Sequence, residues 1–106
     1  MIDLPENPTI ADLQQFVAAR CEERGWTDRT DIERLMFLTE EVGEVAKEIR
    51  KSTGKHGYKP GTKEALGEEL VDVLNFIIDI ANANNIDLDA AFRAKWQAVS
   101  TRTWES

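Results

Sequence analysis

The chain has 106 residues, with 13 Lys and Arg against 20 Asp and Glu, which gives a formal net charge of −7. This length suits one domain, and we expect residues 1–106 to form a single unit. The acidic balance argues against binding to a nucleic acid polymer, which requires a basic surface. It leaves room for a phosphorylated small molecule, provided that a metal ion bridges the two negative partners.

One cysteine, Cys21, and one histidine, His56, are present. This content excludes an internal disulfide, a Cys/His zinc site and a di-iron site built from two Glu-x-x-His pairs. The sequence shows no basic-then-apolar leader and no apolar run near the roughly 20 residues that span a bilayer. We therefore expect a soluble, reduced, cytoplasmic protein that does not bind a membrane.

Four segments have the hydrophobic periodicity of helices, and none shows the sustained alternation of a strand. They cover about residues 10–24, 31–50, 63–82 and 88–99. Capping residues stand at three of the predicted starts: Thr9, Thr30 in a capping box with Glu33, and Asp87. The sequence thus predicts an all-α chain, packed as an antiparallel four-helix bundle.

A basic, glycine-rich connection, KSTGKHGYKPG at residues 51–61, joins the second and third segments. Two interpretations of this loop remain open. It is either a solvated connector or a mobile flap that brings positive charge toward an anionic ligand.

Two rows of acidic residues border the apolar faces of the second and third segments. Glu41 and Glu44 are one turn apart, and so are Glu69 and Asp72, with Asp79 further along the same row. Such a row alone is typical of a solvated helix face. Carboxylates that face one another from two packed helices repel unless protons or a cation neutralise them. Carboxylate oxygens suit Mg²⁺, so the two rows together predict a metal site.

The chain resembles the MazG-type nucleoside triphosphate pyrophosphohydrolases, part of the all-α NTP pyrophosphatase superfamily. The matching segments are EEVGEVAKEI, GEELVDVLNFIIDIA, the preceding Glu23–Trp26 and the ending AFRAKWQAVSTRTW. The resemblance covers about residues 13–104, and the double acidic motif is its most specific part.

This resemblance implies hydrolysis of nucleoside triphosphates to the monophosphate and pyrophosphate, a house-cleaning activity on the nucleotide pool. Mg²⁺ is the implied cofactor, with Mn²⁺ able to replace it. Carried over by position, the metal ligands are Glu41, Glu44, Glu69 and Asp72. Glu41 and Glu44 are also our candidates for orienting or deprotonating the attacking water.

The implied substrate contacts come from both ends of the chain. Trp26 and Phe76 would face the base or sugar, and Lys95 the phosphates, with Arg102 as a further phosphate contact. Many members of the family have an asparagine four residues after this lysine, where this chain has Val99. The base and sugar preference therefore does not follow from the resemblance.

Two other functions remain open. One is a non-catalytic helical oligomeric interaction module, and the other is a member of the same superfamily that acts on dUTP or phosphoribosyl-ATP. For any of these functions, the first one included, we expect a homo-oligomer, because the apolar third segment and the aromatic residues of the fourth are hard to bury in one short chain. A homotetramer built as a dimer of dimers is the first expectation, and a homodimer is the alternative.

Overall fold

The computed structural model describes residues 3–52 and 62–101. Four helices follow one another along the chain: α1 (Ile10–Arg24), α2 (Asp31–Ser52), α3 (Thr62–Ala83) and α4 (Leu88–Thr101). No strand occurs within the described residues, so the predicted all-α class and the four helices are confirmed. None of the helices in these two ranges combines the length and apolar character that a membrane span requires.

The helices begin where the sequence predicts their caps. The Thr9 hydroxyl accepts a hydrogen bond from the Asp12 N–H, and the Asp12 carboxylate accepts one from the Thr9 N–H. Thr30 and Glu33 form the same reciprocal box at the start of α2. Asp87 accepts a hydrogen bond from a backbone N–H in the first turn of α4. These bonds satisfy N–H groups that a helix start otherwise leaves without a partner.

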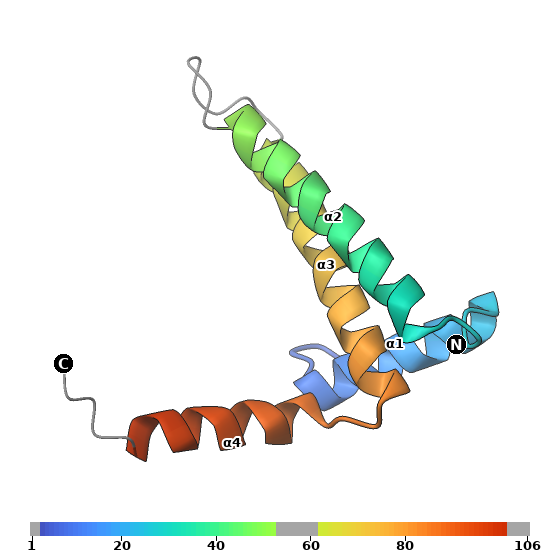
Figure 1. Ribbon diagram of the computed structural model, residues 1–106, viewed down its shortest axis with the longest axis vertical. Coiled ribbons are helices and arrows are strands. Elements are labelled where there is room, and N and C mark those ends of the chain that lie inside the picture. Colours follow the sequence, from blue (N-terminus) through green and yellow to red (C-terminus); the bar gives the residue numbers. More distant parts are fainter. Residues whose placement is uncertain (1–2, 53–61, 102–106) are drawn as a thin grey trace.

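α2 and α3 form an antiparallel pair that runs side by side over most of their length (Figure 1). Arg34 of α2 faces Asp79 of α3, with Nε and Oδ2 3.1 Å apart. Three residues further along α2, Phe37 stacks on Phe76, which lies three residues earlier on α3, with ring centroids 5.6 Å apart. The two facing pairs are three residues apart on α2 and three residues apart on α3. This equal spacing shows that the two helices pack in one defined axial register.

α1 lies across one end of this pair, where Gln14 joins it to the turn between α3 and α4. The Gln14 side-chain amide donates hydrogen bonds to Asn82 Oδ1 (3.0 Å) and to the Ile86 carbonyl (2.9 Å). Its Oε1 accepts one from the Leu88 N–H at 3.0 Å. One side chain therefore ties α1 to the end of α3 and to the start of α4.

α4 extends away from the α2–α3 pair, and its contacts are chiefly with α1 (Figure 1). The expected closure of all four helices into one bundle is therefore wrong for the single chain. The turn before α4 explains the direction of this helix, because Asn85 adopts a positive φ of 55° there. Asparagine tolerates this left-handed conformation better than most residues.

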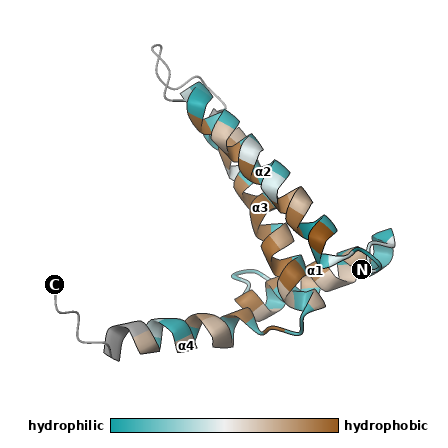
Figure 2. Cartoon of the chain, in the orientation of Figure 1, coloured by the Kyte–Doolittle hydropathy of each residue, from teal (hydrophilic) through white to brown (hydrophobic). Residues whose placement is uncertain are grey.

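Much apolar surface stays uncovered in the single chain. Most of α3 is apolar (brown in Figure 2). Ile78 and Ala81 of this helix are buried, but an adjacent face is open to solvent. The large side chains on that face are 41–53% exposed: Leu70, Val71, Leu74 and Ile77. Phe92 and Trp96 of α4 are 60% and 55% exposed. Contiguous apolar surface of this kind is typical of a subunit interface.

We predict that Gln14→Ala destabilises the protein by about 1–3 kcal/mol, because it removes the side-chain partner of the Leu88 N–H, the Ile86 carbonyl and Asn82 Oδ1. Urea unfolding at one fixed protein concentration measures the loss. Gln15→Ala is the matched control, because Gln15 is the exposed neighbour on the same helix. Equal stability of the two variants would contradict the assignment.

Candidate active site

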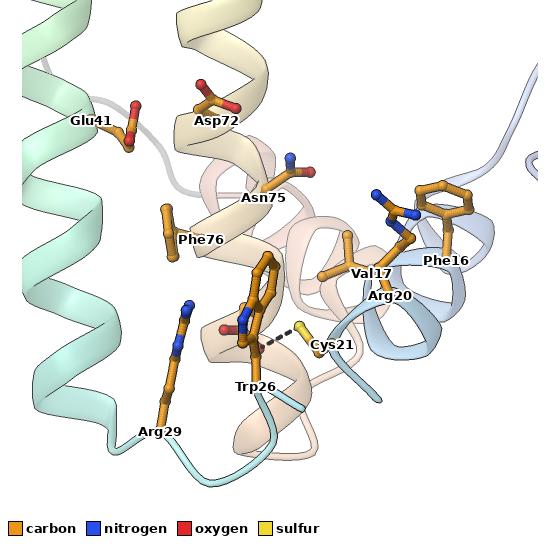
Figure 3. Close-up of a pocket in the computed structure, with 11 residues that line it drawn as sticks. Phe16, Val17, Arg20, Cys21, Trp26, Arg29, Glu41, Asp72, Asn75 and Phe76 are labelled. Carbon is orange, nitrogen blue, oxygen red and sulfur yellow. Dashed lines mark hydrogen bonds between the residues drawn. The ribbon is translucent and has the colours of Figure 1, made fainter. Parts of the chain in front are cut away.

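A cavity of about 500 Å³ opens between α1, the α1–α2 turn and the α2–α3 pair (Figure 3). Aromatic rings, two arginines and carboxylates share its wall, and a cavity of this size suits a drug-sized or nucleoside-sized ligand. The lining residues are Phe16, Val17, Arg20, Cys21, Trp26, Arg29, Glu41, Asp72, Asn75, Phe76 and Asp79.

Three carboxylates meet at one side of this cavity. Glu41, Glu69 and Asp72 each present an oxygen atom within 4.8 Å of the other two. Their three-residue spacing places Glu69 and Asp72 on one face of α3. Glu41 lies opposite Asp72 across the α2–α3 pair (Figure 3). Glu41 and Glu69 are partly buried and Asp72 is exposed, so the cluster is open to a ligand from solvent.

Glu44, the fourth predicted ligand, is exposed and lies outside this group of oxygen atoms. Its negative charge still acts on the cluster, because it contributes to raising the pKa of Glu41. The structure thus brings three of the four predicted ligands together and leaves Glu44 one turn further along α2.

The electrostatics of the cluster fit a hard divalent cation. Partial burial raises the pKa of the Glu41 carboxyl, and the charge of Asp72 and a hydrogen bond with Glu69 raise it further. Burial and neighbouring negative charges both disfavour the ionised carboxylate, and a bound cation would offset them. Carboxylate oxygens at this spacing are the donors that Mg²⁺ prefers, so the residues present are suited to hold it.

The opposite side of the cavity is a stack of rings around one guanidinium group. Gly25 ends α1 with a φ of 71°, and the chain then turns into Trp26. The Arg29 guanidinium carbon lies 4.7 Å from the centroid of the Trp26 ring and 4.8 Å from that of Phe37. Phe37 in turn stacks on Phe76. Cation–π contacts thus hold the α1–α2 turn against the α2–α3 pair.

The predicted substrate contacts fall into three groups. Trp26 and Phe76 both line the cavity. Lys95 is exposed on α4, which extends away from the α2–α3 pair (Figure 1), and it is not among the residues that line the cavity. Arg102 lies outside the described residues, as does the basic connection over 53–61.

Several residues of the cavity wall were not predicted. Asn75 lies three residues after Asp72, so its helical spacing could have indicated it. Arg20 and Arg29 reach the cavity because α1 crosses the end of the α2–α3 pair. No local sequence pattern predicts how α1 packs against the α2–α3 pair.

The family model described as the MazG nucleotide pyrophosphohydrolase domain matches residues 29–103, which include all three clustered carboxylates. The chain belongs to the MazG nucleotide pyrophosphohydrolase family. The resemblance noted in the sequence is thereby confirmed. As a member of this family, the protein is classed as a hydrolase that acts on the phosphoanhydride bonds of nucleotides.

Similar proteins support this MazG assignment. The crystal structure of a Bacillus-conserved MazG protein, a nucleotide pyrophosphohydrolase, matches with a TM-score of 0.76 at 30% identity, over 96% of this chain and 100% of that one. Human dCTP pyrophosphatase 1 is 33% identical over 93 residues, which are 83% of this chain and 55% of the human protein. The chain thus spans about half the length of that relative. The uncharacterized protein YvdC of Bacillus subtilis is 28% identical over 100 residues, 88% of this chain and 94% of that protein.

We predict that Glu41→Gln raises the unfolding temperature of the metal-free protein at about pH 7. The raised pKa means that the folded state binds the Glu41 proton more tightly than the unfolded chain. The ionised carboxylate therefore destabilises the fold at neutral pH, and protonation relieves this loss as the pH falls through the raised pKa. The advantage of the variant should accordingly shrink toward about pH 4.3, the ordinary glutamate pKa.

Thermal unfolding in EDTA at several pH values measures this effect. Glu40→Gln is the matched control, because Glu40 is an exposed neighbour on α2 that lies outside the cluster. A gain of equal size in both variants would show that general charge reduction, and not the cluster, is responsible.

Proposed function

We propose that residues 1–106 act as one Mg²⁺-dependent unit that hydrolyses nucleoside triphosphates to the monophosphate and pyrophosphate, with Mn²⁺ able to replace Mg²⁺. The supporting observation is the Glu41–Glu69–Asp72 cluster at the edge of an aromatic cavity in a MazG-family chain. A protein of net charge −7 needs a bridging cation to hold a triphosphate. Removal of harmful or excess triphosphates from the nucleotide pool is the role we propose for this reaction.

In this proposal Glu41, Glu69 and Asp72 hold Mg²⁺, with Glu44 as the next carboxylate along α2. The ion supplies positive charge that stabilises the phosphate oxygens. Glu41 and Glu44 are the candidates to orient the attacking water or to accept a proton from it.

The aromatic side of the cavity would receive the nucleoside. Trp26 is 40% exposed and offers its ring to a base or sugar, and Phe76 lies between it and the carboxylates (Figure 3). The Asn75 side-chain amide, a donor and an acceptor at once, lines the same wall and could read a base edge. The relatives named dCTP pyrophosphatase 1 make dCTP the first substrate to test, with dUTP and phosphoribosyl-ATP as the alternatives.

We predict pyrophosphate release from one or more triphosphates in a panel of natural and modified nucleotides with Mg²⁺. Asp72→Asn should reduce turnover by about 100-fold or more, because it removes a ligand charge from the cluster. Glu68→Gln is the matched control, since Glu68 is an exposed acid of α3 outside the cluster. If no triphosphate is hydrolysed, the non-catalytic interaction module replaces the enzyme as the working hypothesis.

We also propose a homo-oligomer, as a tetramer built from two dimers, with a dimer as the alternative. The support is the uncovered apolar face of α3 and the exposed rings of α4. A role for Lys95 on phosphate also fits an assembly, because α4 extends away from the α2–α3 pair of its own chain (Figure 1), so that Lys95 would contact phosphate in the site of another chain. A symmetric assembly would bury both surfaces with the same contacts in every chain.

We predict that light scattering at micromolar concentration returns a multiple of the 12.0 kDa chain mass. Phe92→Glu should shift the protein toward smaller species, because it places a charge on the exposed apolar surface of α4. Arg93→Glu is the matched control at the neighbouring exposed position, where the side chain is already polar. A monomer for the unaltered chain would contradict the proposed assembly.

A further inference from the structure

Arg34 and Asp79 form a buried ion pair between α2 and α3, two helical turns from the carboxylate cluster. Their residues are 6% and 8% exposed, and Nε of Arg34 lies 3.1 Å from Oδ2 of Asp79. Among the described residues only Ser52 is a further buried polar residue. Buried charges of this kind are costly unless each is paired, so this contact places a strong constraint on how the two helices meet.

Other polar groups of Arg34 and Asp79 form hydrogen bonds with neighbouring residues, one of which lies on α1. The Arg34 Nη1 donates to Asp31 Oδ1 at 3.2 Å, and Asp31 Oδ2 accepts from the Asn84 side chain at 3.0 Å. The Cys21 thiol of α1 donates to Asp79 Oδ1 at 3.7 Å (Figure 3). The pair is therefore a junction of three helices.

The two partners have no equivalent nearby on their own helices. Arg34 is the only basic residue of α2 before Lys47, and Asp79 is the only acid of α3 after Asp72. Seven residues separate Arg34 from Glu41, and the same seven separate Asp79 from Asp72. The ion pair and the facing carboxylates therefore belong to one antiparallel register, two helical turns apart.

Apolar packing between the helices defines this register less sharply. Aliphatic contacts are not directional, and a slip by one turn exchanges one apolar neighbour for another. The same slip would separate Arg34 from Asp79 and leave Arg34 only Asp31 of its own helix, and it would move Glu41 away from Asp72.

We propose that Arg34 and Asp79 are positioning residues, which set the axial register of α2 against α3 and thereby bring Glu41 to Asp72 and Glu69. This inference rests on the proposed function in so far as that cluster is the metal site. Asp79 also lines the cavity, but the role proposed for the pair does not require contact with substrate or metal. Their effect passes through the positions of the three carboxylates.

The decisive variant is Arg34→Met with Asp79→Leu, which replaces the pair by apolar side chains of similar size. Such replacements commonly preserve or increase stability, because they remove a desolvation cost. If the pair sets the register, this variant stays folded but binds Mn²⁺ about 10- to 100-fold more weakly, the range typical when the groups that orient metal ligands are lost. Electron paramagnetic resonance of free Mn²⁺ gives the affinity, and urea unfolding gives the stability.

Arg34→Lys with Asp79→Glu is the matched control, because it keeps both charges and nearly the same combined length. It should weaken Mn²⁺ binding less than the apolar double variant does, because a charged pair still joins the two helices. An apolar double variant that is as stable as the unaltered chain and binds Mn²⁺ equally well would overturn the proposal. If that variant does not fold, Asp79→Ala, which removes the acceptor of Arg34 Nε on α3, carries the test below its unfolding midpoint, and an unchanged Mn²⁺ affinity overturns the proposal equally.

A distance measurement separates this inference from the proposed function. Spin labels at Lys47→Cys and Ala83→Cys, two exposed positions on α2 and α3, report the axial register in a Cys21→Ser background that keeps a donor to Asp79. Dilution with unlabelled protein removes distances between chains. We expect one narrow distance with the ion pair, and a broadened distance or one shifted by about 5 Å in the apolar double variant.

The two failures differ in this experiment. A chain that binds no Mn²⁺ but shows the change in distance refutes the metal site and retains the positioning role. A distance that is the same in both chains refutes the positioning role, whatever the metal affinity.

Discussion

The antiparallel register of α2 against α3 is the constraint on which the other features of this protein depend. One stripe of α2 carries a buried cation, an aromatic ring and a carboxylate, at intervals of three and four residues. The facing stripe of α3 carries an anion, a ring and a carboxylate at the same intervals in the opposite direction. Each helix alone would have only an acidic, partly apolar face. The cavity wall and the carboxylate cluster arise because the two stripes meet in one alignment.

Attraction and repulsion act side by side in this alignment. The Arg34–Asp79 pair and the Phe37–Phe76 stack favour the contact, whereas burial and the neighbouring carboxylates raise the pKa of Glu41. Repulsion of that kind lowers stability in the absence of a cation, and functional sites commonly carry perturbed carboxylates for this reason. The favourable contacts lie two turns or less from the repulsive ones, so the fold can hold the carboxylates together before any ligand arrives.

Local features of this fold could be predicted from the sequence, and long-range ones could not. Thr9, Thr30 and Asp87 bond to backbone groups within three residues, so their capping roles need no tertiary structure. The shared face of Glu69 and Asp72 follows likewise from helical spacing.

Which residues of different helices contact one another could not be predicted from the sequence. Asp79 continues the same acidic row as Asp72, so spacing alone could not show that Arg34 neutralises Asp79 and leaves Asp72 to the cluster. The direction of α4 was missed because it depends on a positive φ at Asn85 and on hydrogen bonds that Ile86 and Leu88 form with Gln14, which is far away in the chain.

α3 has a cavity-lining stripe and an exposed apolar stripe. The angle between these stripes around the helix decides whether one face can pack against another chain while the other binds substrate. Asp72, Phe76 and Asp79 line the cavity at steps of four and three residues, and the exposed Leu70, Leu74 and Ile77 repeat those steps two residues earlier. An offset of two residues is about 200° around an α-helix, so the two stripes lie on opposite faces. Burial of the apolar stripe against another chain therefore need not obstruct the cavity. It would instead stabilise the helix that supplies two of the three clustered carboxylates and one half of the buried ion pair.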